Sequence, residues 1–149
     1  MVTASTHQAR AFRLRTQMGT RQEIRVQELS EPLSHYTDAV RGGDQLYLSG
    51  VAPLDAQGAL VGAGDPVAQT RCVLENMALV LEAAGASFVD VVKVVVYLKD
   101  VSHRAAINPV RQEFFGESRP ASTLIEVSDL AVEGMLVEID AVAHMPKGV

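Results

Sequence analysis

One carboxylate is notable because its neighbours in the chain are apolar. Glu138 lies between Val137 and Ile139, in a segment that alternates like a strand with one covered face. A carboxylate in such a strand is costly unless it is paired or used, and desolvation raises its pKa toward that of a general base. The alternative role is a structural hydrogen bond across a subunit interface. Asp140 shares this side of the strand, and we expect it to cap or pair at an edge.

The other residue types that commonly carry chemistry show no productive spacing. The histidines, at positions 7, 35, 103 and 144, lack the spacing of metal ligands. The sequence contains neither a phosphate-binding loop nor a dinucleotide fingerprint. Cys72 has no spacing to a histidine that suggests a nucleophilic pair, and we expect it to be partly exposed. We therefore predict no cofactor and no metal ion.

The elements that must position these residues begin with two strands. Residues 36–40 and 45–50 are strand-like, and the glycine pair at 42–43 between them predicts a hairpin. Another turn follows at residues 55–58.

A long helix comes next. Asp65 can cap its first turn, Pro66 suits the first helical position, and Gly85 suits a left-handed cap at the end. Apolar residues recur at three- and four-residue steps between these ends. After it, residues 89–98 are almost continuously apolar, which predicts a strand buried on both faces.

The last third predicts a second helix and two more strands. The helix runs over residues 102–115, and Pro109 should kink or restart it near Asn108. Strands are predicted over residues 122–127 and 136–143. The order is ββαβαββ, an α/β (α+β) protein with two helices on one face of a mixed sheet.

Composition limits the class of protein. The chain has 149 residues, 48% hydrophobic and 21% charged, which indicates one globular domain. A net charge of −5 disfavours a nucleic-acid partner, and the apolar runs are too short to span a membrane. We expect a cytoplasmic protein with a flexible N-terminal extension over residues 1–22 and a domain over residues 23–146.

Seven short segments of the chain form a recognisable series. The segments are Tyr36-Thr37-Asp38-Ala39-Val40, Leu48-Ser49-Gly50, Gln69-Thr70-Arg71 with Leu74-Glu75-Asn76, Glu82-Ala83-Ala84-Gly85-Ala86-Ser87, Asp90-Val91-Val92-Lys93, Tyr97-Leu98-Lys99-Asp100 and Val137-Glu138-Ile139-Asp140-Ala141. Taken together and in this order, they resemble the RidA/YjgF family of enamine/imine deaminases. The resemblance extends from about Val26 to His144.

This resemblance implies a homotrimer with a chorismate-mutase-like fold and ligand clefts between subunits. In such a cleft the C=N bond of a small imine or enamine acid is hydrolysed. The water-positioning acid corresponds to Glu138, and the cleft-lining residues correspond to Tyr36, Ser49, Gly50 and Asn108.

Each of these cleft residues also has a structural alternative. Tyr36 can be a core ring, Ser49 and Gly50 can begin a turn, and Asn108 can cap a helix. His35, next to Tyr36, is either a polar group at the cleft mouth or a surface residue.

One expected residue is absent. The family's Pro-Ala-Arg-Ser segment is here Pro120-Ala121-Ser122-Thr123, so that Ser122 stands where the resemblance places a carboxylate-binding arginine. A hydroxyl cannot replace the two charge-assisted hydrogen bonds of a guanidinium. Arg119 can reach the cleft only if Pro120 turns the chain.

We therefore expect either a deaminase for a small enamine or imine acid, or a variant for another amine such as an aminomuconate-type enamine. Ser122 and Arg119 would then help to bind the substrate. The alternative is a non-catalytic trimeric small-molecule-binding or regulatory protein. The net negative charge of the chain disfavours an RNA-cleaving activity.

Overall fold

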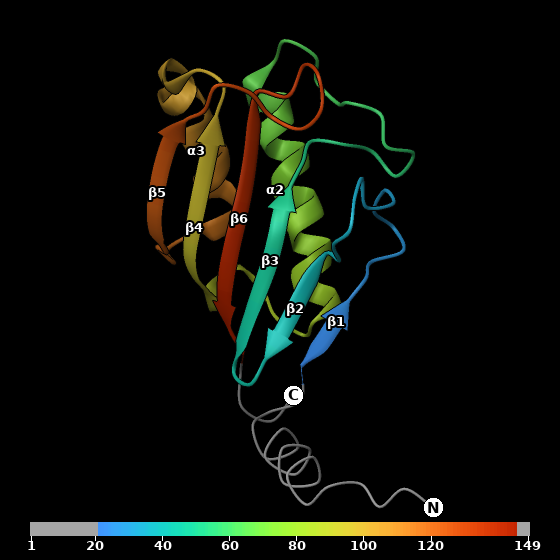
Figure 1. Ribbon diagram of the computed structural model, residues 1–149. Helices are drawn as coiled ribbons and strands as arrows, with labels where there is room; N and C mark the ends of the chain where they lie inside the picture. Colours follow the sequence, from blue (N-terminus) through green and yellow to red (C-terminus); the bar gives the residue numbers. More distant parts are fainter. Residues whose placement is uncertain (1–20, 146–149) are drawn as a thin grey trace, which may run out of the picture.

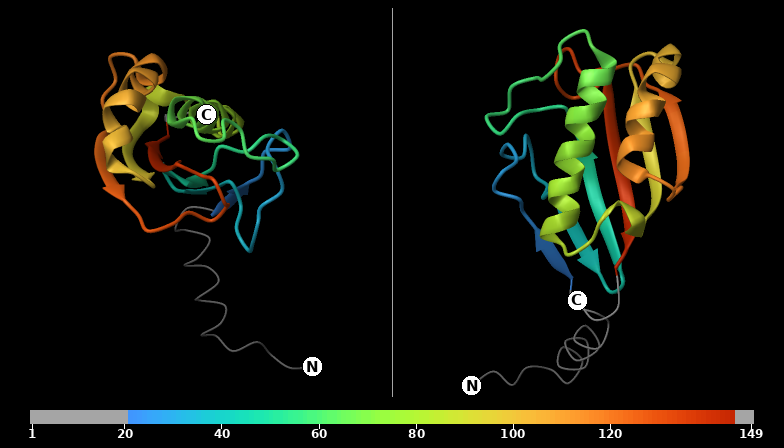
Figure 2. Two further views of the ribbon diagram at one scale, coloured as in Figure 1. Left: turned by 90° about the horizontal axis from the view of Figure 1, so that it is seen from above. Right: turned by 180° about the vertical axis from the view of Figure 1, so that it is seen from behind.

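Six strands form one sheet, and two helices lie on one of its faces. A computed structural model describes residues 21–145. The helices lie behind the sheet in Figure 1 and in front of it in the reverse view of Figure 2, which confirms the predicted α+β class. The strands are β1 (Gln22–Ile24), β2 (Ala39–Gly42), β3 (Gln45–Val51), β4 (Val91–Leu98), β5 (Ala121–Glu126) and β6 (Val137–His144). The helices are α2 (Pro66–Ala83) and α3 (Arg104–Phe115), and the 3-10 turns are η1 (Phe88–Asp90) and η2 (Val101–His103).

The last strand of the chain lies in the middle of the sheet, whose order is β1-β2-β3-β6-β4-β5. β4 and β5 pair in parallel, and the other neighbours are antiparallel. β3 and β4 therefore run in the same direction on either side of β6, connected through α2, as the strand–helix–strand order predicts. The predicted hairpin is also present, since Gly42 pairs with Gln45 across a turn in which Gly43 has a φ of 61°.

The start of the sheet differs from the prediction. β1 is an additional short strand, and the strand predicted over residues 36–40 begins only at Ala39. The reason lies in Asp38, whose Oδ2 accepts hydrogen bonds from the Val26 backbone N–H at 2.7 Å and from Arg25 Nη1 at 2.8 Å. This carboxylate holds the segment after β1 in place.

Helix α2 has the predicted ends. Asp65 Oδ1 accepts from the backbone N–H groups of Val67 and Ala68, each at 3.0 Å, and Gly85 has a φ of 78° just beyond the helix. The partly exposed position predicted for Cys72 is wrong. Cys72 is buried, with Sγ 3.7 Å from the Leu54 carbonyl oxygen, because the segment after β3 covers that side of α2.

Helix α3 is one unbroken helix, which contradicts the predicted interruption near Asn108. The helix begins at Arg104, so that Asn108 is an interior residue and not its N-cap. Asp100 starts the preceding η2 turn by accepting a hydrogen bond from the Ser102 backbone N–H at 2.8 Å. Pro109 lies close to the beginning of α3 and removes only one helical hydrogen bond there.

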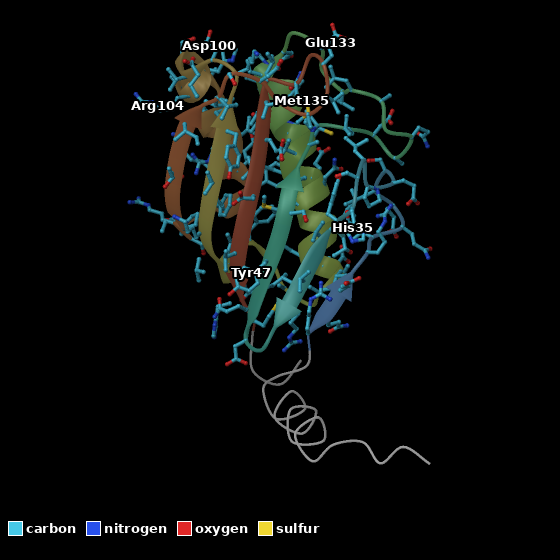
Figure 3. All side chains as sticks on the ribbon, viewed as in Figure 1. His35, Tyr47, Asp100, Arg104, Glu133 and Met135 are labelled. Atoms are coloured by element: carbon cyan, nitrogen blue, oxygen red, sulfur yellow. The ribbon has the colours of Figure 1, made fainter. Side chains whose placement is uncertain are left out.

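The two faces of the sheet differ in burial. Val94 and Val96 of β4 are buried beneath the helices, whereas Val95 and Tyr97, which alternate with them and face the other way, are only half-buried. β4 is thus covered on one face only within this chain, contrary to the prediction. On the same uncovered face, the Tyr47 side chain is 52% exposed (Figure 3), and Ile125 is 40% exposed. This face of the sheet therefore carries exposed apolar side chains.

Within residues 21–145, no helix is both long and apolar enough to cross a membrane. The predicted extension over residues 1–22 lies almost wholly outside the described residues, and its boundary at residue 22 stays a prediction.

Candidate functional site

Glu138 projects from the central strand β6 onto the uncovered face of the sheet. Its neighbours Val137 and Ile139 are buried on the helix side, while Glu138 is half-buried. Among residues 21–145, no side chain or backbone group forms a hydrogen bond or ion pair with its carboxylate. Burial raises the pKa of Glu138, and the negative charge of Asp140 raises it further. These are the properties expected of a carboxylate kept available as a base.

Asp140 pairs in the middle of the sheet and not at an edge, contrary to the prediction. Its Oδ2 accepts a hydrogen bond from the Tyr97 hydroxyl at 2.6 Å. This hydrogen bond, together with burial and the nearby carboxylates, raises the pKa of Tyr97 to about 12. Tyr97 stays protonated at neutral pH and holds Asp140, which leaves Glu138 as the unpaired acid of the two.

The Glu138 carboxylate lies directly against Gly50 of β3. A Cβ placed on Gly50 would be 1.9 Å from Glu138 Oε1, so that only glycine leaves space for the carboxylate in this position. The β3–β6 register shifts between Leu48 and Val51, and this irregularity places Gly50 beside the acid. Gly50 therefore lies inside a strand and does not begin a turn.

Ser49 and Tyr36 lie beside this pair. The Ser49 hydroxyl donates to the Thr37 carbonyl oxygen at 2.6 Å, which joins β3 to the loop that carries Tyr36. Tyr36 is 45% exposed, and its hydroxyl accepts from the Leu33 backbone N–H at 3.2 Å, so that it is not a core ring. Tyr36, Ser49 and the exposed His35 line a cavity of about 350 Å³.

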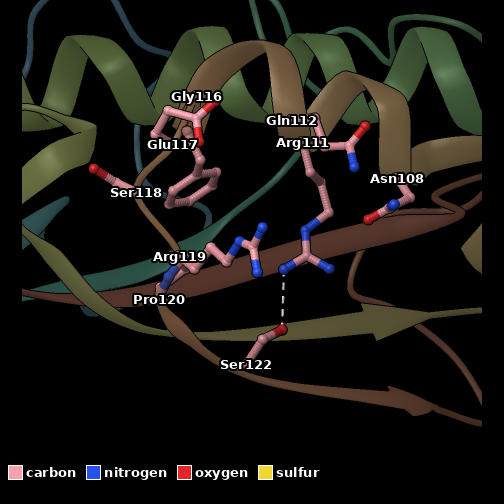
Figure 4. A pocket seen from close by; sticks show the side chains of 10 residues that line it. Asn108, Arg111, Gln112, Gly116, Glu117, Ser118, Arg119, Pro120 and Ser122 are labelled. Carbon is pink, nitrogen blue, oxygen red and sulfur yellow. Dashed lines mark hydrogen bonds between the residues drawn. The ribbon is translucent and has the colours of Figure 1, made fainter.

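The other three predicted binding residues line a second cavity, of about 570 Å³, between α3 and β5 (Figure 4). Asn108 enters it from the helix, Ser122 from the strand, and Arg119 from the connection between them. Arg119 precedes Pro120 outside β5, so that strand alternation does not fix its direction and it shares the cavity with Ser122.

Sequence reasoning missed Arg111, which lies in the same cavity. Its Nη2 donates to the Ser122 hydroxyl oxygen at 3.0 Å (Figure 4). Arg111 is half-buried, and this burial lowers its pKa from the ordinary value. The signal that could have found it is its position three residues after Asn108, on the same side of a helix.

The two groups of predicted site residues lie on opposite faces of the sheet. Ser122 pairs in register with the buried Val94 and faces α3, whereas Glu138 pairs with Tyr97 on the uncovered face. Strand β4 also separates their two strands. A small molecule bound to one chain cannot contact both groups.

Comparison with known proteins identifies the family. A family model described as endoribonuclease L-PSP matches residues 27–145. The chain belongs to the endoribonuclease L-PSP family. A RutC family protein of Pyrococcus horikoshii is 43% identical over 121 residues, which cover 81% of this chain and 95% of the relative. The 3-aminoacrylate deaminase RutC of Acinetobacter baylyi is 40% identical over 114 residues, covering 76% and 90%.

Solved structures of L-PSP family proteins share the fold. The crystal structure of RidA from an Antarctic Psychrobacter is 34% identical, with a TM-score of 0.78 over 83% of this chain and 99% of that chain. The predicted membership of the RidA/YjgF family and the predicted chorismate-mutase-like fold are thereby confirmed.

Within the part of this L-PSP protein that the structure describes, no three histidine, cysteine, aspartate or glutamate side chains gather into a possible metal site. Cys72 is buried, and burial raises its pKa, so that it is poorly suited to act as a nucleophile. The groups available for chemistry are thus the unpaired Glu138 carboxylate on one face and the polar cavity on the other.

Proposed function

We propose that this L-PSP family protein hydrolyses a small enamine or imine acid to an oxo acid and ammonia, in a cleft between two copies of the chain. The observation that carries the proposal is the Glu138 carboxylate, half-buried against Gly50 and without a partner among residues 21–145. Burial raises the pKa of this carboxyl above its ordinary value, which makes the carboxylate a stronger base. The RutC relative, named as a 3-aminoacrylate deaminase, supports this substrate class.

With 3-aminoacrylate as substrate, the carbon next to the carboxylate gains a proton and the amino nitrogen loses one, which converts the enamine into its imine tautomer. Glu138 takes a proton from water as the water oxygen bonds to the imine carbon, and the imine nitrogen gains a proton. In the resulting carbinolamine the amino nitrogen gains a proton and the hydroxyl loses one as the C–N bond breaks, which releases ammonia and leaves 3-oxopropanoate. The backbone at Gly50 and the hydroxyls of Ser49 and Tyr36 surround this centre.

The carboxylate end of the substrate requires cationic or polar groups. The cleft needs a second chain because, within one chain, these groups lie on the face of the sheet opposite Glu138. In our proposal Asn108, Arg119 and Ser122 of a neighbouring copy bind this end, while Glu138 and its neighbours act at the nitrogen-bearing carbon. The apolar uncovered face of the sheet supports such an assembly, since its exposed Tyr47 and Ile125 would be buried there. We propose a homotrimer.

A second candidate function follows from Ser122. Where the resemblance places an arginine, this chain has a serine, which weakens the case for ordinary turnover of a small imino acid. A non-catalytic trimer that binds or senses a small molecule would use the same cleft without hydrolysis.

One assay separates the two functions. The purified chain is supplied with 3-aminoacrylate or 2-aminoacrylate generated in situ, and ammonia and oxo-acid release are measured against the uncatalysed rate. We expect acceleration that Glu138→Gln reduces by about 100-fold or more, the usual contribution of a general base. Glu82→Gln, which alters an exposed carboxylate on α2, is the control and should leave the rate unchanged.

If the unaltered chain gives no acceleration with either substrate, the hydrolytic proposal fails. A gain of turnover on Ser122→Arg in that case would support the binding function of the natural chain.

A further inference from the structure

We propose that Arg111 is the residue that binds the substrate carboxylate in this chain, supplied from helix α3 in place of the arginine missing at position 122, with Arg119 as the second cation of the same cavity. The substrate class in this statement rests on the proposed function. The proposal is based on the hydrogen bond from the Arg111 guanidinium to the Ser122 hydroxyl. This hydrogen bond lies inside the cavity that Asn108 and Arg119 also line.

Two other partly buried arginines, Arg25 and Arg71, differ from Arg111 in their partners. Arg25 binds Asp38 at 2.8 Å, and Arg71 binds Glu113 at 2.7 Å, so that these guanidinium groups already have carboxylate partners. Among residues 21–145, no carboxylate pairs with Arg111 or Arg119. A half-buried cation without a counter-ion is unfavourable, which points to an anionic ligand as the missing partner.

The Arg111 side chain also keeps donors for such a ligand. A guanidinium has five N–H donors, and the structure assigns one of them to the Ser122 hydroxyl. That hydrogen bond fixes the side chain across the cavity floor, with Arg119 directed into the same space (Figure 4). A carboxylate can then accept two parallel hydrogen bonds from Arg111.

The position of the guanidinium explains the role of Ser122. An arginine at position 122 would extend from β5 toward α3, into the space that the Arg111 side chain now occupies. The serine leaves that space open and supplies the hydroxyl that orients Arg111. The two positions together thus provide one guanidinium, contributed by the helix.

The inference is tested by binding, without turnover. The probe is 3-hydroxypropanoate, an unreactive carboxylate of substrate size, titrated into the full chain and followed by calorimetry or by amide NMR shifts. We expect Arg111→Gln to weaken binding by about tenfold or more, as for a lost charge-assisted pair. Arg111→Lys should recover only part of the affinity, because a lysine cannot donate to both carboxylate oxygens in the same plane.

Two further variants make the test specific. The control Arg104→Gln removes an exposed arginine at the start of the same helix and should change the affinity less than twofold. The double variant Arg111→Gln with Ser122→Arg returns the guanidinium to the strand, and we expect it to restore most of the binding. Unchanged binding by Arg111→Gln would overturn the inference, as would equal binding of 3-hydroxypropanamide or tighter binding of inorganic phosphate.

The binding test of Arg111 and the turnover test of the deaminase proposal can fail independently of each other. If the chain turns over 3-aminoacrylate and Arg111→Gln leaves kcat and KM unchanged, the deaminase proposal stands and the role of Arg111 fails. If no enamine is turned over but probe binding depends on Arg111, the carboxylate site stands and the deaminase proposal fails.

Discussion

At the scale of single residues, the contact between Glu138 and Gly50 determines where the acid lies. Replacement of Gly50 by alanine places a Cβ 1.9 Å from Glu138 Oε1, so that the carboxylate must move away. We expect Gly50→Ala to lower kcat/KM by about tenfold or more, since a displacement of about 1 Å at a reacting group has large effects. Gly42→Ala is the matched control, because a Cβ there has no atom within 4 Å, and it should leave the kinetics unchanged. Equal effects of both substitutions would contradict this geometry.

The raised pKa of Glu138 sets the pH dependence. Because the carboxylate must be ionised to act as a base, kcat/KM should fall as the pH is lowered through this pKa, above the range of an ordinary glutamate. Asp140→Asn removes the second cause of the shift, so that the acidic limb should move to lower pH. An acidic limb that stays in place in this variant would show that Glu138 does not control it.

The raised pKa of Glu138 also predicts how the stability of the fold depends on pH. A carboxyl group with a raised pKa in the folded state binds its proton more tightly there than in the unfolded chain. The protonated group therefore contributes to the free energy of unfolding at low pH, and this contribution is lost as the pH rises through the raised pKa. Glu138→Gln should therefore unfold at a higher temperature than the unaltered chain at pH 7, with a smaller difference at pH 4.

Some of these residue properties could be read from the sequence and others could not. Alternation alone placed Glu138 opposite the buried face of its strand. Arg111 was missed because its significance depends on Ser122, which is distant in sequence and meets it only in the folded chain. The burial of Cys72 depends likewise on a contact with the segment around Leu54.

At the scale of elements, Gln69 connects helix α2 to the strand that carries the acid. This residue is fully buried, and its Oε1 accepts from the Leu136 backbone N–H at 2.7 Å, immediately before β6. Its Nε2 donates to the carbonyl oxygens of Gly62 and Gly134, at 3.2 and 3.0 Å. One side chain thus satisfies three backbone groups of two loops.

Gln69→Leu leaves these three backbone groups without their partner. We expect a loss of about 3 kcal/mol in the free energy of unfolding, the cost of leaving buried polar groups unpaired. Urea denaturation at a fixed protein concentration measures this loss, with the exposed Gln27→Leu as control. A loss no larger than that of the control would mean that the loops do not depend on Gln69.

The elements themselves were predicted best where local chemistry fixes them. The caps at Asp65 and Gly85 define α2 from the sequence alone, as the two glycines define the β2–β3 hairpin. β1 has too few residues to show a period, and it exists because Asp38 and the pairing with β2 hold it. The restart of the helix predicted near Pro109 was wrong, because α3 begins five residues earlier and continues through the proline.

At the scale of the whole molecule, the uncovered sheet face and the placement of Glu138 and Ser122 on opposite faces of the sheet both support the proposed homotrimer. Sedimentation equilibrium should give a mass of about 48 kDa, three times the 16.0 kDa of the chain. Substitution of Tyr47 by lysine places a charge on this apolar face and should shift the mass toward 16.0 kDa. A stable monomer of the unaltered chain would rule out a cleft between subunits.

The most direct test of this shared cleft is complementation between two inactive variants. Glu138→Gln removes the acid on one side of the cleft, and Ser122→Tyr fills the cavity on the other side with an aromatic ring. The two chains are unfolded, mixed in equal amounts and refolded together. If each site takes Glu138 from one chain and the cavity from its neighbour, about one quarter of the sites combine two intact halves, and about a quarter of the normal activity should return. Activity that stays at the level of the separate variants would contradict a site shared between chains.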